Sequence, residues 1–199
     1  MALSTPHIIG LTGGIGSGKS VVSHLLRLMD VPVYDCDCEA KRLMHQNAEI
    51  RTSLIKIAGD KVYLENGQLN RAYLATFMFG NAERVAQVNH IVHPVVRSDF
   101  KQWAKLQGKA IVAVESAILF EAEMDGDVDT VWVVHAPEDI RLNRAVQRDA
   151  SNAEAVRSRM KSQKNEQDYI HRADRVIYND GSRSLIKQVK ELLREISAK

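Results

Sequence analysis

The chain has 199 residues, of which 45% are hydrophobic, and its formal net charge is +2 at pH 7. This length allows one main domain with inserted sub-regions. The near-neutral charge gives no reason to expect nucleic acid or an acidic membrane surface as a partner, and the sequence has no apolar run long enough to span a bilayer. Residues 1–6 are too short and too polar for a signal peptide, so we expect a cytoplasmic protein.

A phosphate-binding loop is the first motif along the chain. Residues 7–12 are typical of a buried strand, and apolar residues recur at helical spacing from Val21 to Met29. Between them, residues 13–20 match the pattern G-x-x-x-x-G-K-[ST]. The first amides of a helix attract anions, and glycines let the backbone approach a phosphate chain closely. A nucleotide site is therefore predicted, and a glycine-rich turn without a ligand is the plain alternative.

The residue types in this loop suggest individual roles. Lys19 supplies a point charge for the outer phosphates, and the Ser20 hydroxyl can be a ligand of Mg²⁺. We expect nucleotide contacts along the whole loop and the first helical turn. The residues concerned are Gly14, Ile15, Gly16, Ser17, Gly18, Lys19, Ser20 and Val21.

Two carboxylates, Asp35 and Asp37, follow a short second strand predicted at 31–34. In an open parallel sheet, ligands bind outside the carboxyl ends of the strands, so the pair is expected on the same edge as the phosphate loop. One carboxylate can accept the proton of an acceptor hydroxyl, and the other can cap the helix expected at 38–46. We favour Asp37 as the base. The flanking Cys36 and Cys38 suggest neither a disulfide framework nor a strong zinc site.

A helical insertion is predicted at 40–106, because its apolar residues recur at helical rather than alternating spacing. Pro94 predicts a break or kink inside it. Next to that break, His93 and Arg97 are candidates for contact with an anionic substrate. A lone histidine at such a position is more often structural, so the residues alone leave both interpretations open.

Further strands are predicted at 110–114, 130–134 and 176–178, and an amphipathic helix at 182–196 closes the chain. Alternating strands and helices indicate an α/β fold, with a mostly parallel sheet covered on both faces. Glu115 ends the central strand, where it can hold a metal-bound water or simply be a helix-start acid. The same two alternatives stand for Glu121.

An arginine-rich segment is predicted at 141–172. Arg141, Arg144 and Arg148 share one helix face at i, i+3 and i+7. One or two of them can reach over the phosphate loop and neutralise charge during phosphoryl transfer, although most such runs are solvated faces. Residues 179–181 form a turn signal after the last strand, which makes Asn179 a candidate for contact with the nucleotide base.

Taken together, these motifs resemble the dephospho-CoA kinase family over nearly the whole chain. The similarity covers the opening 11–20, the Asp-x-Asp element 35–37, the His-Pro element 91–97 and the Phe-Glu element 118–121. Arg144, Arg148 and 159–163 resemble its lid, and 173–181 resembles its closing strand and turn. Three positions depart from the family pattern: Cys36 stands for the usual Ala, Glu115 for a common Asp and Ala117 for the usual Pro.

The resemblance implies a single P-loop kinase-like domain over 1–199, an acceptor-binding insertion at 40–106 and a lid at 141–172. It implies ATP-dependent phosphorylation of the ribose 3′-hydroxyl of dephospho-CoA, the last step of CoA biosynthesis, with Mg²⁺ and no obligatory protein partner. Its implied catalytic residues are Asp37, Lys19 and Arg148. Nucleotide contacts extend to Arg144 and Asn179, the metal ligand is Ser20, and the implied substrate contacts are Thr12, Asp37, His93 and Arg97.

Two other functions remain open at this point. Another small-molecule kinase of the same fold would act on a nucleoside, a nucleotide or a sugar acid. A nucleotide-dependent switch would make no phosphorylated product, and its GTP-selective N-K-x-D element is not found in the sequence.

Overall fold

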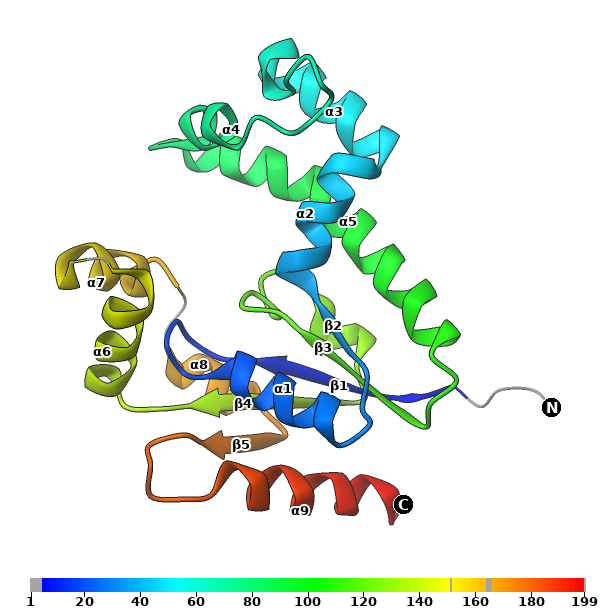
Figure 1. Ribbon diagram of the computed structural model, residues 1–199, viewed down its shortest axis with the longest axis vertical. Coiled ribbons are helices and arrows are strands. Elements are labelled where there is room, and N and C mark those ends of the chain that lie inside the picture. Colours follow the sequence, from blue (N-terminus) through cyan, green and yellow to red (C-terminus); the bar gives the residue numbers. More distant parts are fainter. Residues whose placement is uncertain (1–4, 151, 164–165, 199) are drawn as a thin grey trace. The chain divides into compact units, whose positions relative to one another are not determined.

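The computed structural model describes residues 5–150, 152–163 and 166–198, and it divides the chain into two compact units (Figure 1). One unit comprises Met1–Tyr34 and Ala104–Lys199, and the other comprises Asp35–Trp103. Each unit has its own buried core, and each is described separately below.

The first unit is built on a five-stranded sheet in the order β2-β3-β1-β4-β5. The pairings of β1 with β3, β1 with β4 and β4 with β5 are parallel. The strands are β1 His7–Thr12, β2 Val33–Asp35, β3 Ile111–Glu115, β4 Thr130–His135 and β5 Arg175–Tyr178. The predicted second strand starts two residues late because Pro32 lacks the backbone N–H that a strand needs; its carbonyl still accepts a bond from the Ala113 amide at 2.8 Å.

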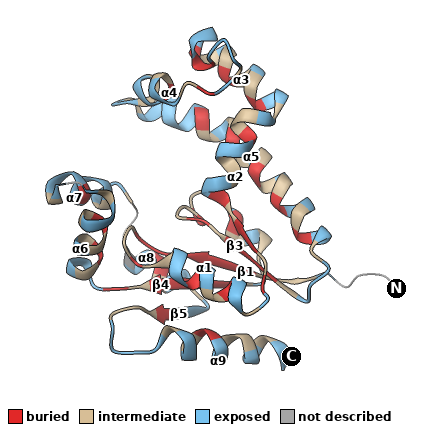
Figure 2. Cartoon of the chain, viewed as in Figure 1, coloured by how far each residue is buried: buried red, intermediate tan, exposed pale blue. Residues whose placement is uncertain are grey.

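Helices cover both faces of this sheet, as the sequence predicts. On one face, α1 (Lys19–Leu28) and α9 (Leu185–Ser197) pack through Leu26 and Val189 against the strand residues Ile9 and Trp132. On the opposite face, Gly10 lies against the side chains of Leu119 and Val128, and α8 (Glu166–Arg172) packs near β4. Figure 2 shows the central strands β1, β3 and β4 as mostly buried, as expected for a sheet covered on both faces.

The connections at the carboxyl ends of three strands matter for function. The chain passes from β1 through residues 13–18 to α1, from β4 to α6 (Glu138–Asp149), and from β5 to the turn at 179–181. Neighbouring parallel strands end at the same edge, so these three connections lie together. The remaining elements of this unit are α7 (Ala153–Lys161) and the short helix η2 (Met124–Asp127). Ser184 caps α9, which explains why this helix begins after the predicted residue 182.

The second unit is helical. It contains α2 (Cys36–Gln46), α3 (Ala48–Ala58), η1 (Asp60–Val62), α4 (Arg71–Met78) and most of α5 (Ala82–Leu106). Of the break or kink expected at Pro94, the break is wrong: α5 continues through this residue. Proline removes only one helical hydrogen bond, and the buried stripe of Val88, Val92, Val96 and Phe100 holds the turns on both sides.

Candidate active site

The phosphate loop wraps around the amino end of α1. Gly18 is the N-cap of this helix in a left-handed conformation, and the first helical turn contains no acidic residue. The positive end of the helix dipole is therefore not neutralised by a neighbouring carboxylate within that turn. Ser20 and Val21 lie exposed in the same turn. This arrangement favours binding of an anion at the loop.

Lys19 directs its ammonium group to the inside of the loop. Its Nζ donates to the carbonyl oxygen of Gly13 at 2.7 Å and lies 3.4 Å from that of Gly14. An ammonium has three donors, so these contacts hold a positive charge beside the backbone that would surround a phosphate chain. The Lys19 ammonium group therefore lies at the backbone of the phosphate loop.

Arg141 is the arginine that lies against the loop. It is 8% exposed, although it belongs to a basic helix face. A Cβ atom built on Gly14 would lie 2.2 Å from its Nη1, and one built on Gly16 would lie 2.2 Å from its carbonyl oxygen. Only glycines allow this approach, so the loop and the start of α6 are fitted to each other. A guanidinium is consequently fixed beside the phosphate loop.

Arg144 and Asn179 form a second connection to the loop. Nη1 of Arg144 donates to the carbonyl of Asn179 at 3.0 Å, and the Asn179 side-chain amide donates to the carbonyl of Ser17 at 2.7 Å. The backbone N–H of Asn179 also donates to the carbonyl of His135 at 2.8 Å, and this bond connects the turn to the end of β4. The turn after β5 is therefore joined by hydrogen bonds to α6, to the phosphate loop and to the end of β4.

Arg148 lies two turns beyond Arg141 on α6, and its side chain is 65% exposed. It donates to Asp149, its neighbour in sequence, and Arg159 of α7 donates to the same carboxylate at 2.8 Å. Hydrogen bonds from Arg148 and then Arg159 lower the pKa of Asp149 to about 2. Asp149 thereby connects α6 to α7. Arg148 contributes to this connection, whereas Arg141 contacts the phosphate loop.

Oxygen donors near the start of α1 suit a magnesium ion. The Ser20 hydroxyl is exposed in the first turn, and Oε2 of Glu115, at the end of β3, accepts from Ser23 Oγ at 2.5 Å. Mg²⁺ prefers few protein oxygens together with substrate phosphates over a cage of side chains. Within the described ranges no group of three or more His, Cys, Asp or Glu residues gathers for a metal, so any magnesium here would rely on phosphate oxygens.

The other predicted residues lie as follows. Thr12, the last residue of β1, is fully buried. In the second unit, Asp35 caps α2, since its Oδ1 accepts from the Cys38 amide at 3.0 Å, while Asp37 lies exposed in the first turn of that helix. His93 and Arg97 lie half-buried on α5, and burial lowers the pKa of His93. Of the two carboxylates, Asp37 is the one that does not serve as the cap.

Comparison with known proteins identifies the family. The dephospho-CoA kinase family model matches residues 7–184 of this chain. The chain belongs to the dephospho-CoA kinase family. A dephospho-CoA kinase from Bacteroides fragilis is 44% identical over 186 residues, which cover 93% of this chain and 90% of that protein.

Solved structures share the fold of this chain. The crystal structure of TT1252 from Thermus thermophilus superposes with a TM-score of 0.81 at 32% identity, covering 98% of both chains. The dephospho-CoA kinase of Campylobacter jejuni gives a TM-score of 0.71 at 23% identity, covering 96% of this chain and 97% of that one, which supports the fold alone. The fold described above is thus shared with solved structures, one of which is named a dephospho-CoA kinase.

Two contacts in this family member were missed by sequence reasoning. Arg141 was recognised as one of three arginines on a face, but its close contact with the loop was not foreseen; its position nearest to β4 is the signal that could have pointed to it. The second contact joins the side chain of Gln163 to the Ile15 amide at 2.8 Å. No spacing rule connects two residues that lie 148 positions apart.

Glu121 has a structural partner in this member of the family. Its Oε1 accepts from the hydroxyl of Tyr169 at 2.6 Å, and the Tyr169 ring stacks at a tilt on Phe120. Burial and then the bond to Glu121 raise the pKa of Tyr169. The contact attaches α8 to the loop after β3, so Glu121 positions the end of the arginine-rich segment.

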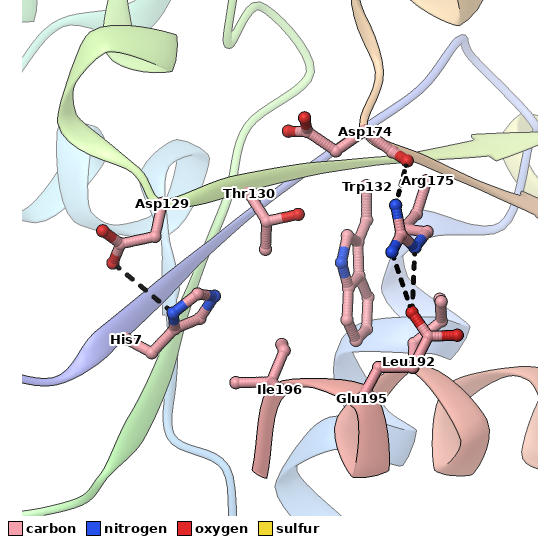
Figure 3. A pocket seen from close by; sticks show the side chains of 9 residues that line it. All are labelled: His7, Asp129, Thr130, Trp132, Asp174, Arg175, Leu192, Glu195 and Ile196. Atoms are coloured by element: carbon pink, nitrogen blue, oxygen red, sulfur yellow. Dashed lines mark hydrogen bonds and ion pairs between the residues drawn. The ribbon is translucent and has the colours of Figure 1, made fainter. Parts of the chain in front are cut away.

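A small cavity of about 120 Å³ lies at the opposite edge of the sheet from the phosphate loop (Figure 3). His7, Thr130 and Arg175, at the starts of β1, β4 and β5, line it together with the end of α9. Arg175 donates to Glu195 at 2.9 Å across it, and Trp132 forms one wall. Its position at the amino ends of the strands separates it from the family's phosphate site.

In the part of the chain that is described, no helix is long and apolar enough to cross a membrane.

Proposed function

We propose that this protein transfers the γ-phosphoryl group of ATP to the ribose 3′-hydroxyl of dephospho-CoA, giving CoA and ADP. The observation that carries the proposal is the family match over residues 7–184, which includes the phosphate loop. The oxygen–phosphorus bond to ADP breaks, a bond from the 3′-oxygen forms, and the hydroxyl proton leaves to a base. This is the final step of CoA biosynthesis.

Nucleotide binding falls to the first unit. The amides of residues 14–18 and of the first turn of α1 are suited to the phosphates, with the Lys19 ammonium beside them. Arg141, Arg144 and Asn179 enclose the loop from α6 and the turn after β5. The positive charge of the two arginines offsets the negative charge of the triphosphate.

Magnesium would be held by the Ser20 hydroxyl and by phosphate oxygens, and it would supply neutralisation of charge between the outer phosphates. Glu115 lies one residue beyond the buried part of β3 and orients Ser23, one turn after Ser20. Its role in this scheme is to fix the first turns of α1.

Asp37 is our candidate for the base. It is exposed at the start of α2, and the capping role belongs to Asp35. A carboxylate can accept the proton late, because the hydroxyl becomes acidic only as it bonds to phosphorus. We assign contact with the anionic groups of the acceptor to His93 and Arg97, and further acceptor contact to Thr12.

The arginine-rich segment 141–172 is our candidate for a lid that excludes water during transfer, with Arg148 stabilising the charge on the transferring group. The Arg148 side chain is exposed and bonded to Asp149, so in this role it would exchange Asp149 for the transferring group. We also propose that the reaction takes place in the cytoplasm and needs no protein partner.

A panel of acceptors tests this function. ADP release from ATP and Mg²⁺ is followed by a coupled assay with dephospho-CoA, a nucleoside, a nucleotide or shikimate. We expect dephospho-CoA alone to raise the rate well above that without acceptor. A preference for another acceptor would indicate a different small-molecule kinase, and slow hydrolysis that no acceptor accelerates would indicate a switch.

A further inference from the structure

The contact between Gln163 and the phosphate loop connects two distant parts of the chain. The backbone N–H of Ile15 donates to Oε1 of Gln163 at 2.8 Å. A backbone N–H can only donate, so the Gln163 atom that faces it must be the side-chain oxygen. A neutral carbonyl oxygen thus lies at an amide of the loop that the motif assigns to phosphate oxygens.

Gln163 is held in place by its own turn. The backbone N–H of Gln163 donates to the carbonyl of Met160 at 3.2 Å, and the Ser162 hydroxyl donates to the carbonyl of Arg159 at 2.7 Å. Arg159 in turn bonds to Asp149, so this turn is attached to α6. The position of the Gln163 side chain therefore depends on the α6–α7 pair.

The same place on the loop is contacted by a cation. A Cβ atom built on Gly14 would lie 3.7 Å from Oε1 of Gln163 and 2.2 Å from Nη1 of Arg141. An oxygen acceptor next to a guanidinium and a loop amide reproduces the surroundings of a phosphate oxygen. The neutral amide makes a weaker bond than a charged oxygen, because charge-assisted hydrogen bonds are about twice as strong as neutral ones.

We propose that Gln163 is an internal ligand of the phosphate loop, which competes with a nucleotide phosphate for the Ile15 amide. The proposal rests on the nucleotide site of the proposed function. One N–H proton cannot bond fully to two acceptors, so a phosphate oxygen that uses it must displace Gln163. Displacement releases the turn at 159–163 from the loop. Phosphate binding and the position of α7 are thereby coupled through one hydrogen bond.

The competition lowers nucleotide affinity by a calculable factor. Apparent affinity falls in proportion to the fraction of molecules whose binding site is available. A typical internal hydrogen bond contributes about 0.5–1.5 kcal/mol net, which corresponds to roughly a 2- to 10-fold reduction in affinity. Removing the side-chain oxygen of Gln163 should therefore raise the nucleotide affinity by that factor.

Binding of ADP with Mg²⁺, measured by calorimetry, tests the proposal without any turnover. We expect Gln163→Ala to bind ADP about 2- to 10-fold more tightly than the unchanged protein. Gln163→Glu keeps the shape of the side chain but adds a charge that holds the amide and repels phosphate, so it should bind ADP more weakly. Ser158→Ala, an exposed position on α7, is the matched control and should leave the affinity unchanged.

Hydrogen exchange of the Ile15 amide gives a second readout. In protein free of nucleotide, we expect this amide to exchange faster in Gln163→Ala than in the unchanged protein. Unchanged exchange, or ADP affinity that stays equal or falls in Gln163→Ala, would overturn the proposal. Both measurements are independent of CoA formation, so a protein that makes no CoA but shows the expected ADP affinities would lose the proposed function and keep this inference.

Discussion

Gly16 offers a direct test of how tightly α6 is fitted to the phosphate loop. Its φ of +77° lies in the left-handed region, and a Cβ atom would lie 2.2 Å from the carbonyl oxygen of Arg141. That oxygen belongs to the backbone of a helix and cannot rotate away alone. To reach 3.0 Å, the loop or the start of α6 must move by 3.0 − 2.2 = 0.8 Å.

Gly108 supplies the matched control for Gly16→Ala. It also has a positive φ, +61°, but nothing lies within 4 Å of its Cβ position. Gly108→Ala should therefore cost only the backbone strain, about 1–2 kcal/mol. Gly16→Ala should cost that strain plus about 1–3 kcal/mol for overpacking, a total of about 2–5 kcal/mol.

The free energy of unfolding from urea titration, with ADP affinity measured in parallel, distinguishes the two variants. We expect Gly16→Ala to lose roughly 1–3 kcal/mol more than Gly108→Ala and to bind ADP at least about 10-fold more weakly, since Arg141 and the loop are displaced. Gly108→Ala should keep its ADP affinity. Equal losses of stability, together with unchanged ADP binding in both variants, would refute the fit between α6 and the loop.

Three further predictions concern charged residues. Asp37→Asn should lower turnover about 10²- to 10⁴-fold in the coupled assay with little change in ADP affinity, and a rate within a few-fold of the unchanged protein would exclude Asp37 as the base. Arg148→Ala should lower kcat more than it weakens ADP binding, whereas Arg141→Ala should weaken ADP binding itself; the reverse pattern in calorimetry and steady-state kinetics would contradict their placement. The pKa of Asp149 in the folded protein, about 2, lies below its ordinary value of 3.8, so its contribution to stability is present above pH 3.8 and is lost as the pH falls to about 2. The stability difference between the unchanged protein and Asp149→Asn should accordingly shrink between about pH 5 and about pH 2, and a difference that is constant over this range would show that the bonds to Arg148 and Arg159 contribute nothing.

The sheet and the phosphate loop follow closely from local sequence. The apolar run at 7–12 and the glycine pattern after it predict β1, the loop and α1 because backbone geometry restricts what such residues can form. The strand limits agree with the prediction to within one residue, except that β2 starts two residues late after Pro32. The last helix starts three residues late, at its Ser184 cap. Pro94 is different, because burial of its neighbours on α5 overrides a local preference that the sequence shows clearly.

The roles of individual side chains depend on distances that spacing does not contain. Arg141 and Arg148 share a helix face, but seven residues separate them by about 10 Å along the axis. Arg141 therefore lies at the loop, whereas Arg148 reaches Asp149. The pair Asp35 and Asp37 was also ambiguous in sequence, and the hydrogen bond from the Cys38 amide assigns the cap to Asp35. Gln163 had no local signal, because its partner Ile15 is brought to it only by folding.

Product analysis by mass spectrometry tests the central claim most directly. The protein is incubated with ATP, Mg²⁺ and dephospho-CoA, and the Lys19→Ala variant is treated in the same way. The account predicts CoA and ADP in equal amounts from the unchanged protein, with the new phosphate on the ribose 3′-oxygen, and little of either from the variant. Consumption of ATP without CoA, or no reaction at all in the unchanged protein, would contradict it.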